Sequence, residues 1–178
     1  MKNFSFVRLT LIAIFVIQIV VIFNIQPWKN AEKQNALINW DVTSYYSYLP
    51  AIFVHQDLKF SFLKNSPINY SEKHQFWPET TPNGNKVIKT TMGMSILYLP
   101  FFLIAHTFAI LSPEADANGF SKTYEIGLTF SCVFYLIIGM YFLSKILLRL
   151  YHKNIVSILY KSVQIDNALL FLTRSNDR

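Results

Sequence analysis

The chain has 178 residues, of which 52% are hydrophobic and 16% aromatic, while only 15% are charged. Soluble domains usually contain about 25% charged residues, so this composition, with a mean hydropathy of +0.30, predicts a membrane protein. The length allows a few membrane helices and excludes a large polytopic enzyme. The net charge is +6, but the basic residues are scattered, which argues against nucleic acid as a partner and favours contact with membrane lipids. The single cysteine, Cys132, excludes an intrachain disulfide.

Residues 1–25 are predicted to form an N-terminal transmembrane anchor. A short basic leader with Lys2 and Arg8 precedes an almost wholly apolar run over residues 9–25. A helix that starts back at residue 4 reaches about 20 residues, the number needed to cross the hydrocarbon. A cleavable signal peptide is the alternative, but its apolar core is usually about 7–15 residues long and ends at small residues. The longer run favours an uncleaved anchor with Trp28 at the lipid–water interface.

The mixed segment 26–124 is predicted to be an extracytoplasmic loop that contains interfacial helices. Apolar residues recur at helical spacing over 41–54, which predicts an amphipathic helix that Pro50 bends or restarts. Turn-forming residues and a short extended segment follow, at 65–67, 81–85 and 86–89.

Residues 92–111 are the ambiguous element, because they carry no formal charge and are long enough to cross a membrane. Residues 125–148 form a clearer span, with Lys and Arg residues after its apolar part. Lys and Arg prefer the cytoplasmic side, so two crossings place both basic ends of the chain in the cytoplasm, whereas three crossings place the second basic end outside. We therefore expect an all-α integral membrane protein with two transmembrane helices, three being the alternative.

In the two-crossing arrangement the N-terminus is cytoplasmic and residues 92–111 form an interfacial or re-entrant helix. Pro100 and His106 suit that position, because irregular backbone and polar groups are tolerated where protein or water covers them. Residues 149–178 then form a cytoplasmic tail, in which weak helical periodicity over 155–172 is compatible with an amphipathic helix.

Asp41 is the first candidate for chemistry. It lies just outside the first apolar span, at the start of the predicted helix 41–54. In that position an Asp can cap the helix by accepting bonds from its free N–H groups. It can also act as a general base if partial burial beneath Trp40, Tyr45 and Tyr46 raises its pKa toward the working pH. The two roles are compatible.

Lys86 and Lys89 are the second candidates. Lysines next to an apolar segment commonly contact lipid headgroups or solvent. They can also hold a phosphate, since the ammonium is a compact point charge, and Lys89 directly precedes the apolar segment 92–111. The four histidines and the cysteine have no metal-site spacing, so no metal and no cofactor is expected.

The order of motifs along the chain resembles a known family. An apolar anchor is followed by W-D-x-x-x-Y-Y-x-Y-L-P at 40–50, D-L-K-F at 57–60, and N-G-N-K-V-I-K-T-T-M-G-M-S-I-L-Y-L-P-F-F-L-I-A-H at 83–106. This pattern is similar to the N-terminal part of bacterial GT-C-type membrane glycosyltransferases, which use polyprenyl-phosphate-linked sugars. The resemblance implies a multi-pass protein of the bacterial inner (cytoplasmic) membrane that acts in the cell envelope.

By that resemblance, Asp41 is the catalytic base that activates the acceptor, and Lys89, assisted by Lys86, contacts the donor phosphate. Thr90-Thr91 stand where the family usually has prolines. The resemblance covers residues 1–150, whereas the family's enzymes have many more membrane helices. We therefore expect an incomplete portion of such an enzyme, truncated or frame-shifted, or a small relative that is inactive alone.

A non-enzymatic alternative remains open at this point: a small membrane subunit or scaffold. Small residues at Gly127, Ser131 and Gly139 allow another membrane helix to pack closely. In that case Asp41 is only a helix cap, and both lysines contact lipid.

Overall fold

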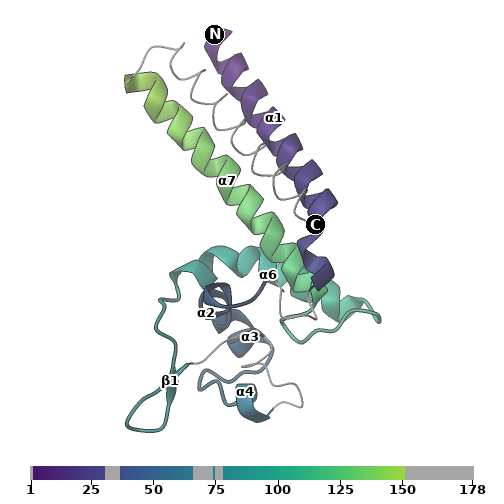
Figure 1. Cartoon of the computed structure of the whole chain (residues 1–178), viewed down its shortest axis with the longest axis vertical. Helices are drawn as coiled ribbons and strands as arrows, with labels where there is room; N and C mark the ends of the chain where they lie inside the picture. The colour runs from purple at the N-terminus through teal and green to yellow at the C-terminus, as the bar shows by residue number, and fades with distance from the viewer. Residues whose placement is uncertain (1, 31–36, 66–73, 75–77, 151–178) are drawn as a thin grey trace, which may run out of the picture. The chain divides into compact units, whose positions relative to one another are not determined.

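The computed structural model describes residues 2–30, 37–65, 74 and 78–150 (Figure 1). The expected tail beyond residue 150 lies outside the described residues, as do the part of the predicted turn at 66–67 and the helix expected over 155–172. Within the described part the protein is mostly helical. Its elements are α1 (Lys2–Ile25), the 3-10 helix η1 (Pro27–Asn30), α2 (Asp41–Tyr46), α3 (Tyr48–Phe53), α4 (Phe62–Asn65), β1 (Glu79–Thr80), β2 (Lys86–Val87), α6 (Gly93–Leu111) and α7 (Lys122–Leu150).

Three of these helices, α1, α6 and α7, are long and apolar enough to cross a membrane, judged by length and composition. The helical prediction is confirmed for all three. Helix α7 extends further in both directions than the span predicted over 125–148. Its first turn continues into the packed core, where Tyr124 and Glu125 are buried, and Arg149 in its last turn interacts favourably with the helix dipole.

The chain divides into two compact units, residues 1–25 with 132–178 and residues 26–131. In the first unit, α1 packs against the later part of α7 through a buried Ile14. The partly buried side chains around Ile14 are Ile137, Met140, Leu147 and Leu148. This contact is an apolar helix pair, and most of the large α1 side chains remain exposed.

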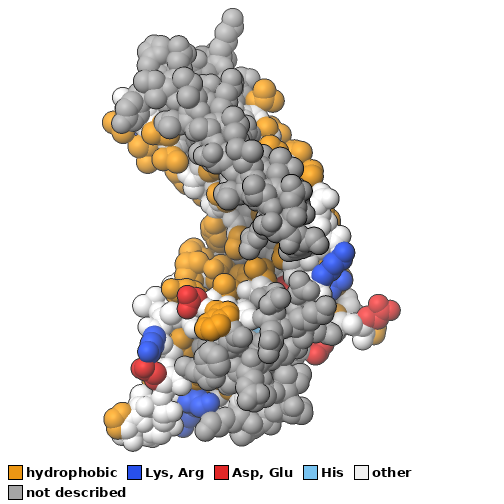
Figure 2. All heavy atoms as spheres, viewed as in Figure 1, with side chains coloured by type: hydrophobic (Ala, Val, Ile, Leu, Met, Phe, Trp, Pro, Cys, Tyr) orange, Lys and Arg blue, Asp and Glu red, His pale blue; other side chains and the backbone are white. Residues whose placement is uncertain are grey.

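The second unit, residues 26–131, contains the larger core. Its buried side chains come from α2, α3, α4, α6, the first turns of α7 and the segments that connect them, with Tyr46, Phe102 and Tyr124 in contact. On α6 the buried face consists of Ser95, Phe102, Ala105 and Ala109. The other face is exposed and apolar, with Ile96, Ile104, Phe108 and Leu111 each more than 60% exposed. Figure 2 shows hydrophobic side chains gathered over this helix.

Helix α6 packs closely on the first turns of α7. A Cβ atom added to Gly127 would lie 3.0 Å from the Cβ of Ala105 and 3.1 Å from the carbonyl oxygen of Phe101. The imidazole of His106 and the hydroxyl of Tyr124 add a hydrogen bond of 2.6 Å. Figure 1 shows α6 running across these turns of α7, residues 122–131, rather than alongside them.

The single helix predicted over 41–54 is wrong in one respect, since α2 and α3 are separate and the break is at Ser47. The buried Ser47 hydroxyl donates to the Thr43 carbonyl at 2.6 Å, a contact that commonly bends helices. Pro50 is the third residue of α3, where a missing N–H group breaks no helical hydrogen bond. In a continuous helix over 41–54, Pro50 would leave the Tyr46 carbonyl without its N–H donor. Helix α2 ends at Tyr46 and α3 begins at Tyr48, so the break agrees with the prediction that Pro50 bends or restarts the helix.

The strands β1 and β2 form a two-stranded antiparallel hairpin in which Glu79 pairs with Val87 and Thr80 with Lys86. The turn over 81–85 is closed by the Thr81 N–H group, which donates to the Asn85 carbonyl at 2.8 Å. The prediction of a turn at 81–85 is thus confirmed, and that of an extended segment at 86–89 is confirmed for residues 86–87.

Candidate functional site

Asp41 is exposed at the start of α2. The prediction that it caps the helix is wrong: Trp40 occupies the N-cap position, and no side chain makes a capping hydrogen bond there. Asp41 instead lies in the first turn, where its negative charge is favoured by the helix dipole. The expected burial beneath aromatic rings is also wrong, because Tyr46 turns into the core and Trp40 is 62% exposed.

The Trp40 backbone has φ 51° and ψ −129°, a conformation that residues with a side chain rarely adopt. Two acceptors hold it there. The Trp40 N–H group donates to the His74 carbonyl at 3.1 Å and to the Asn39 side-chain oxygen at 2.9 Å. An exposed indole and an exposed carboxylate are thus presented side by side on a restrained backbone.

The residues before Trp40 are held by side chains from distant parts of the chain. The Glu125 Oε1 atom accepts hydrogen bonds from the N–H groups of Leu37 at 2.9 Å and Ile38 at 3.3 Å. The Nδ1 atom of His74 lies 2.7 Å from the Ile38 carbonyl oxygen, and the His74 carbonyl accepts from the Thr43 hydroxyl at 3.3 Å. Both Glu125 and His74 are almost completely buried.

Sequence reasoning missed both Glu125 and His74. The signal available for Glu125 was an acidic residue only three positions after the helix start at Lys122, at the edge of an apolar run. Such a residue must either face water or find hydrogen-bond donors. His74 has no comparable signal, since its neighbours in the sequence are polar.

Tyr46 is the last residue of α2, the helix that Asp41 begins, and its side chain is buried in the core. Its hydroxyl donates to the Gly119 carbonyl at 2.7 Å, and its ring meets Phe102 and Phe120 edge-on. Burial, with smaller contributions from nearby Tyr124 and Glu125, raises the pKa of Tyr46 well above its usual value. Tyr46 therefore stays protonated and serves as a hydrogen-bond donor within the core.

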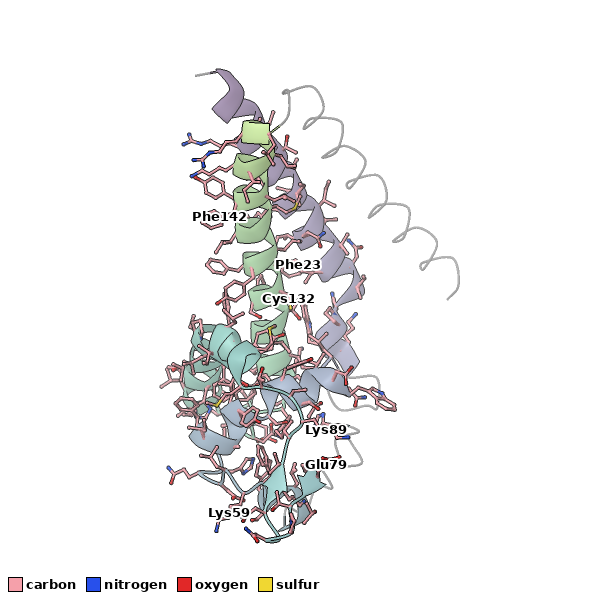
Figure 3. All side chains as sticks on the ribbon, turned by 90° about the vertical axis from the view of Figure 1, so that its left-hand side faces the viewer. Phe23, Lys59, Glu79, Lys89, Cys132 and Phe142 are labelled. Atoms are coloured by element: carbon pink, nitrogen blue, oxygen red, sulfur yellow. The ribbon has the colours of Figure 1, made fainter. Side chains whose placement is uncertain are left out.

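Lys89 lies in the chain between β2 and α6, and its ammonium forms an ion pair with Glu79 at 2.8 Å (Figure 3). Both side chains are exposed, Lys89 by 75% and Glu79 by 64%. The hydrogen bond to Glu79 and the attraction of its charge raise the pKa of Lys89, so the ammonium stays charged. Exposed pairs of this kind are weak, and a phosphate can compete with Glu79 for the lysine.

Lys86 is on β2, half-buried, in register with Thr80. It thus lies in the same hairpin as Glu79, and Lys89 follows directly after that hairpin.

Two hydrogen bonds tie the helices that follow Asp41 to the segment that follows Lys89. The Tyr48 hydroxyl donates to the Thr90 carbonyl at 3.1 Å, and the Ser95 hydroxyl donates to the Tyr45 carbonyl. The compact unit 26–131 thereby holds Asp41 and Lys89 on linked elements. The two side chains do not pair with each other: Lys89 pairs with Glu79, and Asp41 makes no ion pair within the described part of the chain.

The described histidines pack in aromatic surroundings. His55 stacks on Phe62 at 4.0 Å, and His74 contacts Phe120 at 4.8 Å between ring centroids. Over residues 2–30, 37–65, 74 and 78–150, no three His, Cys, Asp or Glu side chains come together as metal ligands would.

The three long apolar helices indicate a helical membrane protein. No protein-family model, curated protein or solved structure matches the chain.

Proposed function

We propose that the chain is the N-terminal portion of a membrane glycosyltransferase that moves a sugar from a polyprenyl-phosphate carrier to an acceptor hydroxyl. The observation that carries this proposal is the composition of one compact unit. Residues 26–131 combine an exposed carboxylate on a restrained backbone, an exposed lysine, and a helix with an exposed apolar face. A substrate with a phosphate head and a hydrocarbon tail requires these last two features together.

In this proposal Asp41 accepts the proton of the acceptor hydroxyl as its oxygen forms a bond to the anomeric carbon. The bond from that carbon to the phosphate oxygen breaks, and the polyprenyl phosphate leaves with the electron pair. Lys89, assisted by Lys86, stabilises the negative charge that develops on the phosphate. Every proton and electron pair is accounted for without a further reactant.

The orientation that we propose is a cytoplasmic N-terminus, a bacterial inner membrane and an extracytoplasmic segment 26–124. Helix α6 then lies along the outer surface of the membrane. Two observations support this position: α6 crosses the first turns of α7, residues 122–131 (Figure 1), and side chains such as Ile104 and Phe108 are exposed on one face. A helix in the membrane surface needs such an apolar face to reach the acyl chains.

The Asp41→Asn variant of the folded chain tests the catalytic role. Transfer of a radiolabelled hexose from polyprenyl phosphate, assayed in membranes that contain the wild-type chain and any downstream portion it requires, should fall by about 10²–10⁴. Glu114→Gln, which also removes an exposed acid of the same segment, should leave transfer unchanged. Full turnover by Asp41→Asn would refute the proposal.

Binding of polyprenyl monophosphate tests the phosphate site without turnover. In lipid nanodiscs, Lys89→Ala should weaken binding, whereas Glu79→Gln should strengthen it because the competing carboxylate is gone. Lys59→Ala, which removes an exposed lysine elsewhere in the same unit, is the matched control. If all three variants bind polyprenyl monophosphate with equal affinity, Lys89 does not contact the phosphate.

The alternative function is a non-enzymatic membrane subunit. Of the three small residues that could admit a partner helix, Gly127 already packs on Ala105 and Ser131 is fully buried. Gly139 has no atom within 4 Å of an added Cβ, so it is the position that favours this alternative. Copurification of a second membrane protein that is lost in Gly139→Leu, without any binding of polyprenyl phosphate, would support it.

A further inference from the structure

Residues 37–40 lie in no helix or strand, so their N–H groups need acceptors from elsewhere. Glu125 supplies one. It is fully buried, and one carboxyl oxygen accepts from two successive N–H groups, those of Leu37 and Ile38. Because 87 and 88 residues separate the partners, this contact fixes the segment to the start of α7 rather than to its own neighbours.

We propose that Glu125 is a positioning residue for Asp41. Between Ile38 and Asp41 lie Asn39 and Trp40, and both are restrained. The Asn39 N–H group donates to the Leu37 carbonyl at 3.0 Å, and the Trp40 N–H group donates to the His74 carbonyl. A displacement at Leu37 and Ile38 is therefore passed to the first residue of α2. This proposal rests on the proposed function only in taking Asp41 as the catalytic base.

A role as core filler does not account for an acid at this position. The surrounding core is apolar, with Ile38, Phe120 and Leu128 among its buried members, and an apolar side chain of similar volume packs as well as a buried acid or better. What Glu125 adds is an acceptor oxygen where irregular backbone meets the core. The acceptor, rather than the volume, is thus the property that the test must isolate.

Hydrogen exchange of the purified full chain in detergent micelles isolates it. In Glu125→Ala, a peptide that begins at or before residue 35 and covers Leu37 and Ile38 should exchange about tenfold faster or more, while α6 peptides keep their wild-type rates. Glu125→Gln retains an acceptor oxygen and should stay within about threefold of the wild type. Glu114→Ala removes an exposed acid and should change neither peptide.

Wild-type exchange at Leu37 and Ile38 in Glu125→Ala would overturn the proposal, and so would Glu125→Gln as fast as Glu125→Ala. If Glu125→Ala speeds hydrogen exchange throughout the unit 26–131, exchange is measured in Glu125→Asp instead, whose side chain is shorter by one methylene. Acceleration confined to residues 37–40 supports positioning, whereas acceleration everywhere or nowhere contradicts it.

Exchange needs no substrate, so its outcome is separate from that of the transfer assay. Faster exchange in Glu125→Ala together with full turnover by Asp41→Asn would support the positioning role and refute the proposed function. Unchanged exchange in Glu125→Ala together with lost turnover in Asp41→Asn would contradict the positioning role and support the proposed function.

Discussion

At the scale of single residues, Gly119 is under three constraints at once. Its φ is +86°, and a Cβ atom added there would lie 2.5 Å from the Cβ of Pro50. Its carbonyl also accepts the hydrogen bond from the buried Tyr46 hydroxyl. Gly84 shares only the first constraint, with φ +78° and no atom within 4 Å of an added Cβ, and it is therefore a matched control.

Gly119→Ala should reduce the free energy of unfolding by more than Gly84→Ala does. Both substitutions place a side chain at positive φ, which costs about 1–3 kcal/mol. Only the first adds a clash with Pro50, and overpacking of this kind costs about a further 1–3 kcal/mol. Thermal unfolding in detergent measures the difference, and equal losses would contradict the contact between the 112–121 loop and α3.

Asp57 organises the turn that leads into α4. Its carboxylate accepts the N–H groups of Lys59 at 2.9 Å and Phe62 at 3.0 Å. Burial alone would raise the pKa of Asp57, but these donors and those of Ser61 outweigh it and lower the pKa below 3.8. Because the folded pKa lies below the unfolded one, the stabilisation is complete above about pH 3.8 and is lost as the pH falls through the folded pKa.

Asp57→Ala should therefore lower the free energy of unfolding by about 1 kcal/mol at neutral pH, the usual net contribution of a hydrogen bond. The deficit relative to the wild type should shrink below about pH 3.8, where the wild-type carboxylate becomes protonated. Thermal unfolding at a series of pH values tests this, with Glu114→Ala as an exposed acidic control. A deficit that is constant with pH would contradict the assignment.

Local sequence could locate Asp41 but could not describe its surroundings. Spacing placed it correctly at a helix start, yet the cap position went to Trp40, because the long-range bond from Trp40 to His74 sets the backbone there. Likewise the sequence shows that Lys89 precedes α6, whereas its ion pair with Glu79 depends on the register of the hairpin. Contacts between residues far apart in the chain carry no periodicity, and those are the contacts that define this site.

At the scale of elements, the contact of α6 with α7 depends on Gly127. Gly127→Ala should destabilise the unit 26–131, because the new Cβ meets Ala105 at 3.0 Å and the Phe101 carbonyl at 3.1 Å. Gly139→Ala, on the same helix with open space around it, should be neutral or stabilising by up to about 1 kcal/mol through helix propensity. Circular dichroism during heating distinguishes the two, and the same sign for both would contradict close packing at Gly127.

The long helices were predictable and the short ones were not. Runs of about 20 apolar residues dominate any local preference, so the expectations for 1–25 and 92–111 agree closely with α1 and α6. The break between α2 and α3 follows Tyr46, to whose carbonyl Pro50 cannot donate a hydrogen bond, and the buried Ser47 hydroxyl bonds to Thr43 at the same place. Helices α2 and α3 both pack against α6, and the local pattern over 41–54 does not reveal that contact.

At the scale of the whole molecule, charge must decide which of the three apolar helices cross the membrane. Lys145 and Arg149 lie in the last turns of α7, while Glu114 and Asp116 lie between α6 and α7. Lys and Arg near a membrane helix favour the cytoplasm, and acidic residues contribute little. With α1 and α7 crossing, the basic residues at both ends of the described chain lie on the same side of the membrane, which this preference predicts to be the cytoplasmic side. If α6 crosses as well, the end of α7 is forced outside.

Single cysteines at Asn85, Glu114 and Lys161 in a Cys132→Ser background test this arrangement. If only two helices cross, as we propose, a membrane-impermeant thiol reagent added to intact cells should label positions 85 and 114 but not 161. Labelling at 85 and 161 without 114 would mean three crossings. Asp41 and Lys89 would then still face outward, but α6 would leave the surface beside Lys89, and the proposed site would lose the apolar face that a polyprenyl chain requires.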